Sequence, residues 1–497
     1  TPLYLENEKD AYISSFVRQT IVNTFTNWRE YVELPEYTFY VDLLEKGIGI
    51  HHAGMLPVFR EIMEILYEKK HIKCLIATET FAIGLNMPTR TTIFSSLYKH
   101  DGTQLRLLQS HEFTQMAGRA GRRNLDKVGH VVLLTNLYDT PSEGEYKVLF
   151  QGTPKVLKSK FRITYHVLLN YLHEYSEEDF IQMVQSSMMN TDIDKQIHRC
   201  NTNIIQYQEE EKKYQSMIDA LPFDAMDYFQ QYESLQEKIK YSKNKERKRL
   251  SNQLRSMEEQ DHQKLKQKHL YDTLQEQIKQ RREEESARCF AENYIKDQIH
   301  GLYDILKSNH FIDETHQPTQ KGLNTCYIHE IPCLVFSDFY EEFHKLKHLN
   351  EVNLLCLLCC FYDLKVKDDF KVHIPPFLKD ELRYIDGKIN EYADHELRYN
   401  VYVTCKYKLQ YDLMDSMKQW YESVDDSAKS VSFFQDLKRE KDIFIGDFMK
   451  CCMKIVNMCN ELKIYGTNDN QFDFVEKVNT IQNNIQKNIV SNQSFYL

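Results

Sequence analysis

Two arginines stand three residues apart in the segment Gln115-Met116-Ala117-Gly118-Arg119-Ala120-Gly121-Arg122-Arg123. On a helix, Arg119 and Arg122 would share one face, and the glycines next to them, Gly118 and Gly121, would let that face approach a ligand closely. A guanidinium group is permanently charged, and its planar donors fit phosphate oxygens. The segment therefore predicts a forked clamp on a triphosphate. The alternative is a solvated basic helix.

A second segment combines a hydroxyl, an amide and glycine backbone, in the order Ala77-Thr78-Glu79-Thr80-Phe81-Ala82-Ile83-Gly84-Leu85-Asn86-Met87-Pro88. It directly follows an apolar run at residues 73–77 that predicts a strand. In α/β proteins, ligands bind at the carboxyl ends of parallel strands. Upstream lies Gly47-Ile48-Gly49-Ile50-His51-His52-Ala53-Gly54-Met55-Leu56-Pro57. A pair of histidines is more often structural than catalytic, so we assign this pair no chemistry.

In order and spacing, these three segments resemble the superkiller-type, exosome-linked DExH RNA helicases of superfamily 2. The first two segments resemble helicase motifs VI and V. The resemblance implies that the arginine fingers and the residue that senses the nucleotide are Arg119, Arg122 and Gln115. It implies that further nucleotide-binding residues are Gly84, Asn86 and Gly118. It also implies that Thr78 contacts a phosphate of bound RNA.

The sequence departs from this family at the nucleotide loop. No G-x-x-x-x-G-K-[ST] loop occurs in the 497 residues, so ATP and Mg²⁺ are expected to be bound mainly by a first motor domain that is missing here. Asp313-Glu314-Thr315-His316 spells D-E-x-H, but it lies downstream of the arginine segment and is expected to be a surface turn. The chain starts with Thr1, and no opening strand is recognisable in residues 1–33. We therefore expect it to begin inside the second motor domain.

The pattern of apolar and polar residues along the chain predicts a multidomain protein, with a partial RecA-like α/β domain followed by mostly α structure. Strand-like runs at residues 73–77 and 130–134 alternate with a helical pattern at residues 58–67, which indicates a parallel sheet. Beyond residue 155 the patterns are almost entirely helical. By resemblance, the domains are a second RecA-like domain at 1–150, a winged helix at 151–192 and 290–325, a helical arm at 193–289 and a helical bundle at 326–497.

The arm is predicted from an apolar seam with 4/3 spacing over residues 193–221, broken only at Glu211. Residues 271–278 could supply the partner helix. Its basic run comprises Lys238, Lys240, Lys243, Lys245, Arg247, Lys248 and Arg249. Such a run is more often a solvated helix face than an RNA contact. After the arm, residues 310–313 and 318–322 are expected to form two short strands around a turn.

The segment 442–450 resembles the start of the ratchet helix that lies along RNA in this family. Lys450 and Lys454 are four residues apart and would project from one helix face. The residues expected on the opposite, core side are Phe448, Cys452, Ile455 and Cys459. The resemblance makes the two lysines RNA contacts, and the alternative is a pair of ordinary exposed lysines.

Composition restricts the class of protein. A net charge of −10 argues against a generally basic nucleic-acid coat, although it leaves room for an internal basic channel. The 12 cysteines lack disulfide-framework or zinc spacing, which indicates reduced, packed thiols and no metal. The longest apolar run, residues 354–362, is too short to cross a membrane. We expect an intracellular protein, nuclear or cytoplasmic.

Together these patterns predict an ATP-dependent RNA helicase that translocates on single-stranded RNA and unwinds duplexes for RNA processing or decay. The expected partners are single-stranded RNA and the RNA exosome or adaptor proteins. The alternative from another class is a catalytically inactive RNA-binding scaffold that keeps the helicase shape. The intact pair of arginines favours the first hypothesis, while the absent nucleotide loop favours the second for this chain alone.

Overall fold

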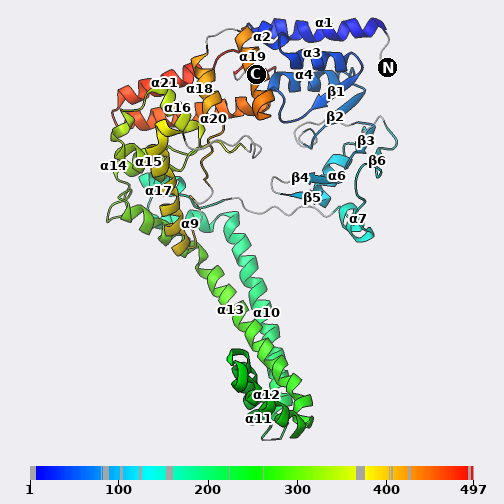
Figure 1. Ribbon diagram of the computed structural model, residues 1–497, viewed down its shortest axis with the longest axis vertical. Helices are drawn as coiled ribbons and strands as arrows, with labels where there is room; N and C mark the ends of the chain where they lie inside the picture. The colour runs from blue at the N-terminus through cyan, green and yellow to red at the C-terminus, as the bar shows by residue number, and fades with distance from the viewer. Residues whose placement is uncertain are drawn as a thin grey trace.

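The computed structural model describes residues 7–79, 81, 89–100, 104–122, 126–152, 161–222, 224–260, 262–364, 375–401, 403–404, 407–423, 427–490 and 494–495. An α/β part comes first in the chain, a long helical arm projects from the middle, and a helical bundle lies beside the α/β part (Figure 1). The predicted fold class, a small α/β region followed by a largely helical remainder, is confirmed.

The α/β part alternates short strands with helices. Its elements are α1 Asn7–Thr24, α2 Trp28–Val32, α3 Pro35–Leu44, β1 Ile48–His51, α4 Pro57–Glu68, β2 Cys74–Ala77, β3 Thr91–Phe94, β4 Tyr98–His100, β5 Leu105–Leu107, α6 Ser110–Ala117, β6 His130–Leu133 and α7 Glu143–Phe150. The strands predicted at 73–77 and 130–134 are β2 and β6. The helix predicted at 58–67 is α4, which begins at a proline because proline is tolerated in the first turn.

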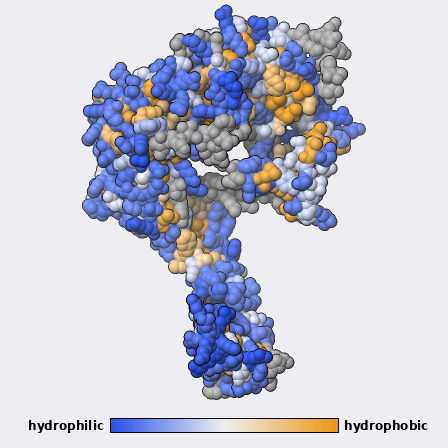
Figure 2. Space-filling model, in the orientation of Figure 1, coloured by the Kyte–Doolittle hydropathy of each residue, from blue (hydrophilic) through white to orange (hydrophobic). Residues whose placement is uncertain are grey.

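The described strands form three separate pairs. β1 pairs with β2 and β3 pairs with β6, both in parallel, while β4 and β5 are antiparallel. The parallel pairing agrees with the sequence prediction, but the described residues do not join the pairs into one sheet. Several apolar side chains of these strands stay exposed, among them Ile76 at 60% and Ile93 at 59%. Figure 2 shows apolar side chains gathered on this part of the surface.

Two hydrophobic cores divide the α/β part. Helices α1 to α4 contribute buried residues such as Ile21, Phe59 and Leu66 to the large core that also holds the bundle. The segment from β3 to α7 has a small core of its own, made of Phe94, Leu97, Leu108, Phe113 and Leu149. The region 1–150 is therefore two packing units.

The arm is an antiparallel pair of long helices with a helical tip (Figure 1). The elements here are α8 Tyr165–Glu174, α9 Glu177–Gln185, α10 Met188–Asp219, α11 Ala225–Tyr241, α12 Asn244–Gln260 and α13 His262–Ser308. The seam buries Cys200, Ile204 and Ile218 of α10. At the break in the seam, Glu211 meets Arg281 of α13, with Oε1 and Nε 2.7 Å apart. At the tip, Ile218, Phe229, Tyr271 and Leu274 form a small core that holds α11 against the pair.

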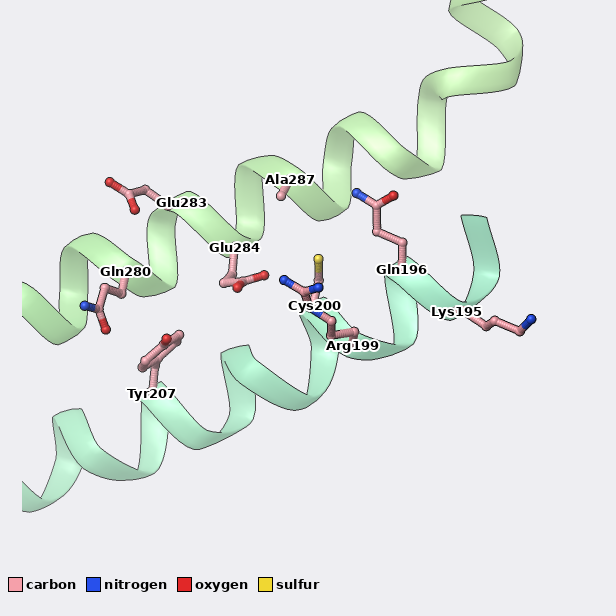
Figure 3. Close-up of a pocket in the computed structure, with 9 residues that line it drawn as sticks. All are labelled: Lys195, Gln196, Arg199, Cys200, Tyr207, Gln280, Glu283, Glu284 and Ala287. Carbon is pink, nitrogen blue, oxygen red and sulfur yellow. The ribbon is translucent and has the colours of Figure 1, made fainter. Parts of the chain in front are cut away.

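Near the base of the arm the two helices leave an open cleft of about 740 Å³. Cys200 and Tyr207 point from α10 toward Glu284 of α13 (Figure 3). The Glu284 carboxylate accepts a 2.9 Å hydrogen bond from Asn203. Polar groups thus interrupt the apolar seam here, and their pairing fixes which residues of the two helices face each other.

The segments before and after the arm pack together. Leu168 and Leu169 of α8 and Phe180 of α9 are fully buried in the same core as Phe311. The prediction of two short strands at 310–313 and 318–322 is wrong, because neither segment forms a strand. Only Ile312 and Pro318 form an isolated bridge, because the Thr319 hydroxyl accepts from the Gly322 amide and starts the helix α14 Gln320–Thr325. The assignment of this region as a winged helix stays a prediction.

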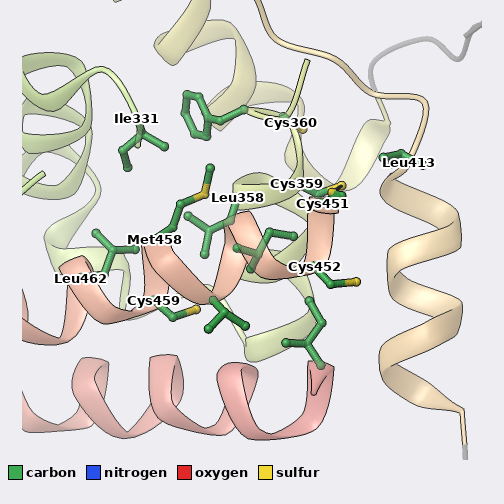
Figure 4. Close-up of a cluster of buried hydrophobic side chains, with 14 of the residues drawn as sticks. Ile331, Leu358, Cys359, Cys360, Leu413, Cys451, Cys452, Met458, Cys459 and Leu462 are labelled. Atoms are coloured by element: carbon green, nitrogen blue, oxygen red, sulfur yellow. Dashed lines mark hydrogen bonds between the residues drawn. The ribbon is translucent and has the colours of Figure 1, made fainter. Parts of the chain in front are cut away.

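The bundle contains α15 Cys333–Glu342, η1 His344–Leu346, α16 Glu351–Cys359, η3 Pro376–Leu378, α17 Lys379–Arg398, α18 Met414–Glu422, α19 Ser427–Lys441, α20 Ile445–Asn468 and α21 Phe472–Ile485. α20 and α16 bring Cys359, Cys451 and Cys452 together in the core (Figure 4). The Cys359 and Cys451 sulfurs are 3.9 Å apart, well beyond a disulfide bond. Burial raises the pKa of the Cys360 and Cys452 thiols well above their usual value. The bundle cysteines shown in Figure 4 are therefore packed thiols, as the sequence predicts, whereas Cys74 and Cys289 are exposed.

Candidate functional site

The carboxyl ends of β1 and β2 lie side by side. The pairing register sets His51 opposite Ala77, and the Thr78 amide donates to the His51 carbonyl at 3.1 Å. Thr78 is exposed and directly follows β2, at the strand end where the sequence analysis expects it. A turn then brings the Phe81 amide to the Thr78 carbonyl. The predicted nucleotide-binding residues Gly84 and Asn86 lie outside the described residues.

His51 is buried at the end of β1. Its Nε2 lies 2.8 Å from the Glu64 carboxylate, which is also buried. Its ring meets Phe81 edge to face, with centroids 5.0 Å apart, and Phe81 meets Tyr67 in the same way. The buried Nδ1 of His51 has no hydrogen-bond partner among the described residues. Sequence reasoning gave this histidine no role, and the structure shows that it supports the turn after β2.

The arginine segment begins on α6. The side chain of Glu112 accepts from the Gln109 amide and completes a capping box. It also accepts two 2.9 Å hydrogen bonds from Arg106 and lies 2.9 Å from Lys99. The hydrogen bonds from Arg106 have the largest effect on this carboxyl group, and they hold the pKa of Glu112 far below its usual value. α6 is thereby fixed onto β4 and β5, and Gln115 is exposed on it.

The two arginines do not share a helix face, which corrects the prediction. α6 ends at Ala117, Gly118 caps it, and Arg119 and Arg122 lie in the following turn. The helix stops because this backbone pairs elsewhere. Thr89 donates to the Arg119 carbonyl at 2.8 Å and accepts from the Gly121 amide at 2.6 Å.

Gly121 has φ +93°, a left-handed conformation that favours glycine. A side chain at Gly118 would also stand 2.8 Å from the Thr114 carbonyl oxygen. The local backbone therefore explains why both positions of the segment are glycine.

Arg122 has an acidic partner that sequence reasoning missed. Its Nε and one Nη each lie 2.8 Å from the Asp126 carboxylate, and its backbone amide donates to the same group at 3.0 Å. This pairing holds the pKa of Asp126 far below its usual value and raises that of Arg122. The available signal was the acid four residues after the arginine. A phosphate would have to compete with Asp126.

The segment 77–88 and the arginine segment meet at Thr89, the residue that directly follows Pro88 in the sequence. Thr89 and Ala120 form a parallel β-bridge, and the Thr89 backbone pairs with Arg119 and Gly121. The two strongest sequence motifs therefore approach each other here.

The two candidate lysines lie on α20. The four residues predicted on the opposite side are buried: Phe448, Cys452, Ile455 and Cys459. Each lysine has an acidic neighbour, Lys450 with Asp447 at 2.9 Å and Lys454 with Glu330 at 3.8 Å. Lys454 also lines an open cavity of about 350 Å³ with His329, Tyr407 and Lys408.

The donor set bears on ATP and Mg²⁺. Exposed or half-exposed guanidinium groups at Arg119 and Arg122 fit phosphate oxygens. Across the described part of the chain, no three His, Cys, Asp or Glu residues are grouped so that they could hold a metal ion. The D-E-x-H sequence is a surface turn, as predicted, because the Asp313 carboxylate accepts from the Thr315 and Gln317 amides. The described guanidinium groups thus fit the phosphate oxygens of a triphosphate.

Comparisons with known proteins agree with the motifs. Residues 9–124 match the family model described as the helicase conserved C-terminal domain. The antiviral helicase SKI2 of Saccharomyces cerevisiae is 47% identical over 170 residues, 34% of this chain and 13% of that protein. Superkiller complex protein 2 of Homo sapiens is 46% identical over 140 residues, 28% of this chain and 11% of that protein.

A third relative is the exosome RNA helicase MTR4 of Homo sapiens. It is 46% identical over 140 residues, 28% of this chain and 13% of that protein. The matched stretches thus span 11% to 13% of these relatives' own lengths. In the described residues, no helix is long and apolar enough to serve as a membrane span.

Proposed function

We propose that the chain is the second motor domain and helical part of an ATP-dependent RNA helicase. Residues 9–124 match the helicase conserved C-terminal domain, and stretches of 170 and 140 residues are 47% and 46% identical to the helicases SKI2 and MTR4. The family resemblance inferred from the sequence is confirmed for this region. The observation that carries the proposal is the backbone pairing of Thr89, which directly follows the segment 77–88, with Arg119 and Gly121 of the arginine segment.

In this function, a first motor domain brings ATP and Mg²⁺ against the arginine turn. Arg122 exchanges Asp126 for the terminal phosphate, and Arg119 and Gln115 complete the contact, with Gly118 leaving room for the approach. Bound ATP supplies the energy of each step. Thr78, Lys450 and Lys454 hold phosphates of single-stranded RNA, so sequence preference is weak. The direction of movement would be 3′ to 5′ by family resemblance.

The partners and location follow from the relatives. Two of them carry superkiller or exosome in their names, and we propose the RNA exosome or its adaptors as partners of this chain. We propose an intracellular protein, nuclear or cytoplasmic, that acts in RNA processing or decay.

The test is ATP hydrolysis. The purified 497 residues should hydrolyse no ATP, with or without RNA, because they contain no nucleotide loop. Supplying a first motor domain from a relative should restore turnover. In that enzyme, Arg122→Ala should lower kcat by roughly 10³-fold, the scale of a lost arginine finger. Arg255→Ala, an exposed arginine on α12, is the matched control.

Two results would count against the proposal. A loss below about tenfold in the Arg122 variant would remove this residue from the phosphate site. RNA binding without any turnover in the completed enzyme would instead support the second candidate, an inactive RNA-binding scaffold. The neutralised Arg122–Asp126 pair is the observation that favours that candidate.

A further inference from the structure

The loop between β1 and α4 touches two distant parts of the chain. His51 meets Phe81, just after the end of β2, with ring centroids 5.0 Å apart. Its neighbour His52 meets Phe444 edge to face at 5.9 Å, and Phe444 is the residue that precedes α20. One loop, residues 51–55, therefore lies between the end of β2 and the start of α20. We call it the joint loop.

α20 rests directly on the backbone of the joint loop. A Cβ added at Gly446 would stand 2.7 Å from the Gly54 carbonyl oxygen and 2.8 Å from that of Met55. Real Cβ atoms do not approach backbone oxygens so closely, so only glycine fits at this point of the helix. Glycine inside a helix costs about 0.5–1 kcal/mol relative to alanine. The close contact gives a reason for that cost.

The joint loop is held on each side. The Gly54 amide donates to His52 Nδ1 at 3.2 Å, and the Met55 amide donates to the His52 carbonyl at 3.1 Å. Burial lowers the pKa of His52, which keeps its Nδ1 free to accept. The 2.8 Å contact between His51 Nε2 and the Glu64 carboxylate ties the loop to α4.

Phe444 is also fixed from the bundle side. The Lys438 ammonium group lies 3.5 Å from its ring centroid, a cation–π contact. Lys450 follows Gly446 by four residues, about one helical turn, so it lies on the part of α20 next to the contact with the joint loop. The Thr78 amide hydrogen-bonds to the other end of the loop through the His51 carbonyl.

We propose that the joint loop fixes the spacing between Thr78 and Lys450, and that His52 and Gly446 are its positioning residues. The proposal rests on the proposed function, in which both residues contact RNA phosphates. Two contacts at a fixed spacing bind one strand as a bivalent site, because the second contact forms at a high effective concentration. If the joint loop is flexible, this gain in affinity is lost although both contacts with the RNA can still form.

The experiment measures the Kd of the full chain for uridine oligonucleotides of increasing length. In the wild type, affinity should rise steeply at the length that first spans both contacts. His52→Ala should reduce that rise by about tenfold or more and leave the affinity for shorter oligonucleotides unchanged. His52→Phe keeps a ring against Phe444 and should retain most of the rise. His198→Ala, an exposed histidine on α10, is the control.

Gly446→Ala tests the other side of the same contact and should lose the rise in the same way. If this variant is less folded by circular dichroism, the two His52 variants decide. Two results would overturn the role of the joint loop. One is a loss of affinity in His52→Ala that is equal at all oligonucleotide lengths. The other is a rise in affinity with length that survives in both His52→Ala and Gly446→Ala. Absence of binding by the wild type at every length would overturn the proposed RNA function itself, and the joint with it.

Discussion

At the scale of single residues, the acidic neighbours of the two lysines on α20 can be tested directly. Lys450 is about half exposed and pairs with Asp447 one turn before it. If Lys450 holds an RNA phosphate, Asp447 competes for it, and Asp447→Asn should strengthen binding of single-stranded RNA about 1.5- to 5-fold at low salt, the range of an exposed ion pair. Asp436→Asn breaks the similar pair with Arg439 on α19 and should change nothing.

The same lysines make a second prediction, on salt dependence. Lys450→Ala with Lys454→Ala should make the plot of log K against log salt less steep by about 1.4, the effect of two phosphates on a single strand. Filter binding over a salt series measures the slope. An unchanged slope would return both lysines to the solvated surface, whatever the absolute affinity does.

The chemistry of the candidate site residues could be predicted from the sequence, but the conformation of the backbone that carries them could not. Arg119 and Arg122 are recognisable as candidate phosphate ligands because a guanidinium group is charged and planar. Their shared helix face was wrong because Thr89, some thirty positions away along the chain, pairs with Arg119 and Gly121. Asp126 was missed for a related reason, since its contact with Arg122 also involves the backbone, where the Arg122 amide donates to the Asp126 carboxylate and the Asp126 amide donates to the Arg122 carbonyl.

At the scale of elements, the arm is the best predicted part. Its apolar spacing indicates two paired helices, and the break at Glu211 coincides with the ion pair to Arg281. The short strands after the arm were harder. The composition around Thr319 favours a strand, while threonine is also a common N-cap residue. In the structure the Thr319 hydroxyl accepts from the Gly322 amide, so the helix forms.

The Glu211–Arg281 pair predicts how the arm responds to substitution. Both side chains are about four-fifths buried. Arg281→Leu should loosen the arm by about 1–3 kcal/mol because it leaves the Glu211 carboxylate without its partner. Adding Glu211→Leu should restore the stability, since it continues the apolar seam. Hydrogen exchange of the α10 amides measures both, and a double variant as loose as the single one would contradict this explanation.

The tip of the arm carries the basic run, and all seven of its residues are exposed. None of the seven forms an ion pair with another residue of the described ranges. Replacing residues 222–269 by a short glycine-serine linker removes the run and keeps the lower part of α10 and α13. If the tip captures RNA, the completed enzyme should keep its ATPase activity and lose affinity for structured RNA. Collapse of ATPase activity would mean that the tip supports the motor domain.

At the scale of the whole molecule, the large core joins the two ends of the chain. Asn27 after α1 donates to the Asn488 carbonyl, and Phe25 packs on Phe495 with centroids 4.8 Å apart. Local patterns cannot reveal such contacts between residues more than 400 positions apart. For this reason the sequence predicts residues 1–150 as one domain, while the packing assigns α1–α4 to the core of the bundle.

Glu61 on α4 is the residue through which this union can be tested. Its buried carboxylate accepts from the Ser494 hydroxyl at 2.8 Å and from the Phe495 amide at 2.7 Å. Glu61→Ala removes the acceptor of both hydrogen bonds, which should cost about 1–3 kcal/mol. Because the lost contact joins α4 to the C-terminal residues, the α/β side should unfold before the bundle.

The chain has two tryptophans, Trp28 on α2 and Trp420 on α18, and they report on the two sides. Labelling with 5-fluorotryptophan gives one ¹⁹F signal for each without any substitution. In urea, the two signals of the wild type should change together, because both residues pack on one core. In Glu61→Ala the Trp28 signal should change at lower urea than the Trp420 signal. Glu68→Ala, an exposed residue of the same helix, should leave the transitions coincident. If both signals of Glu61→Ala shift by the same amount, the C-terminal contact stabilises the molecule as a whole and does not hold the two sides together.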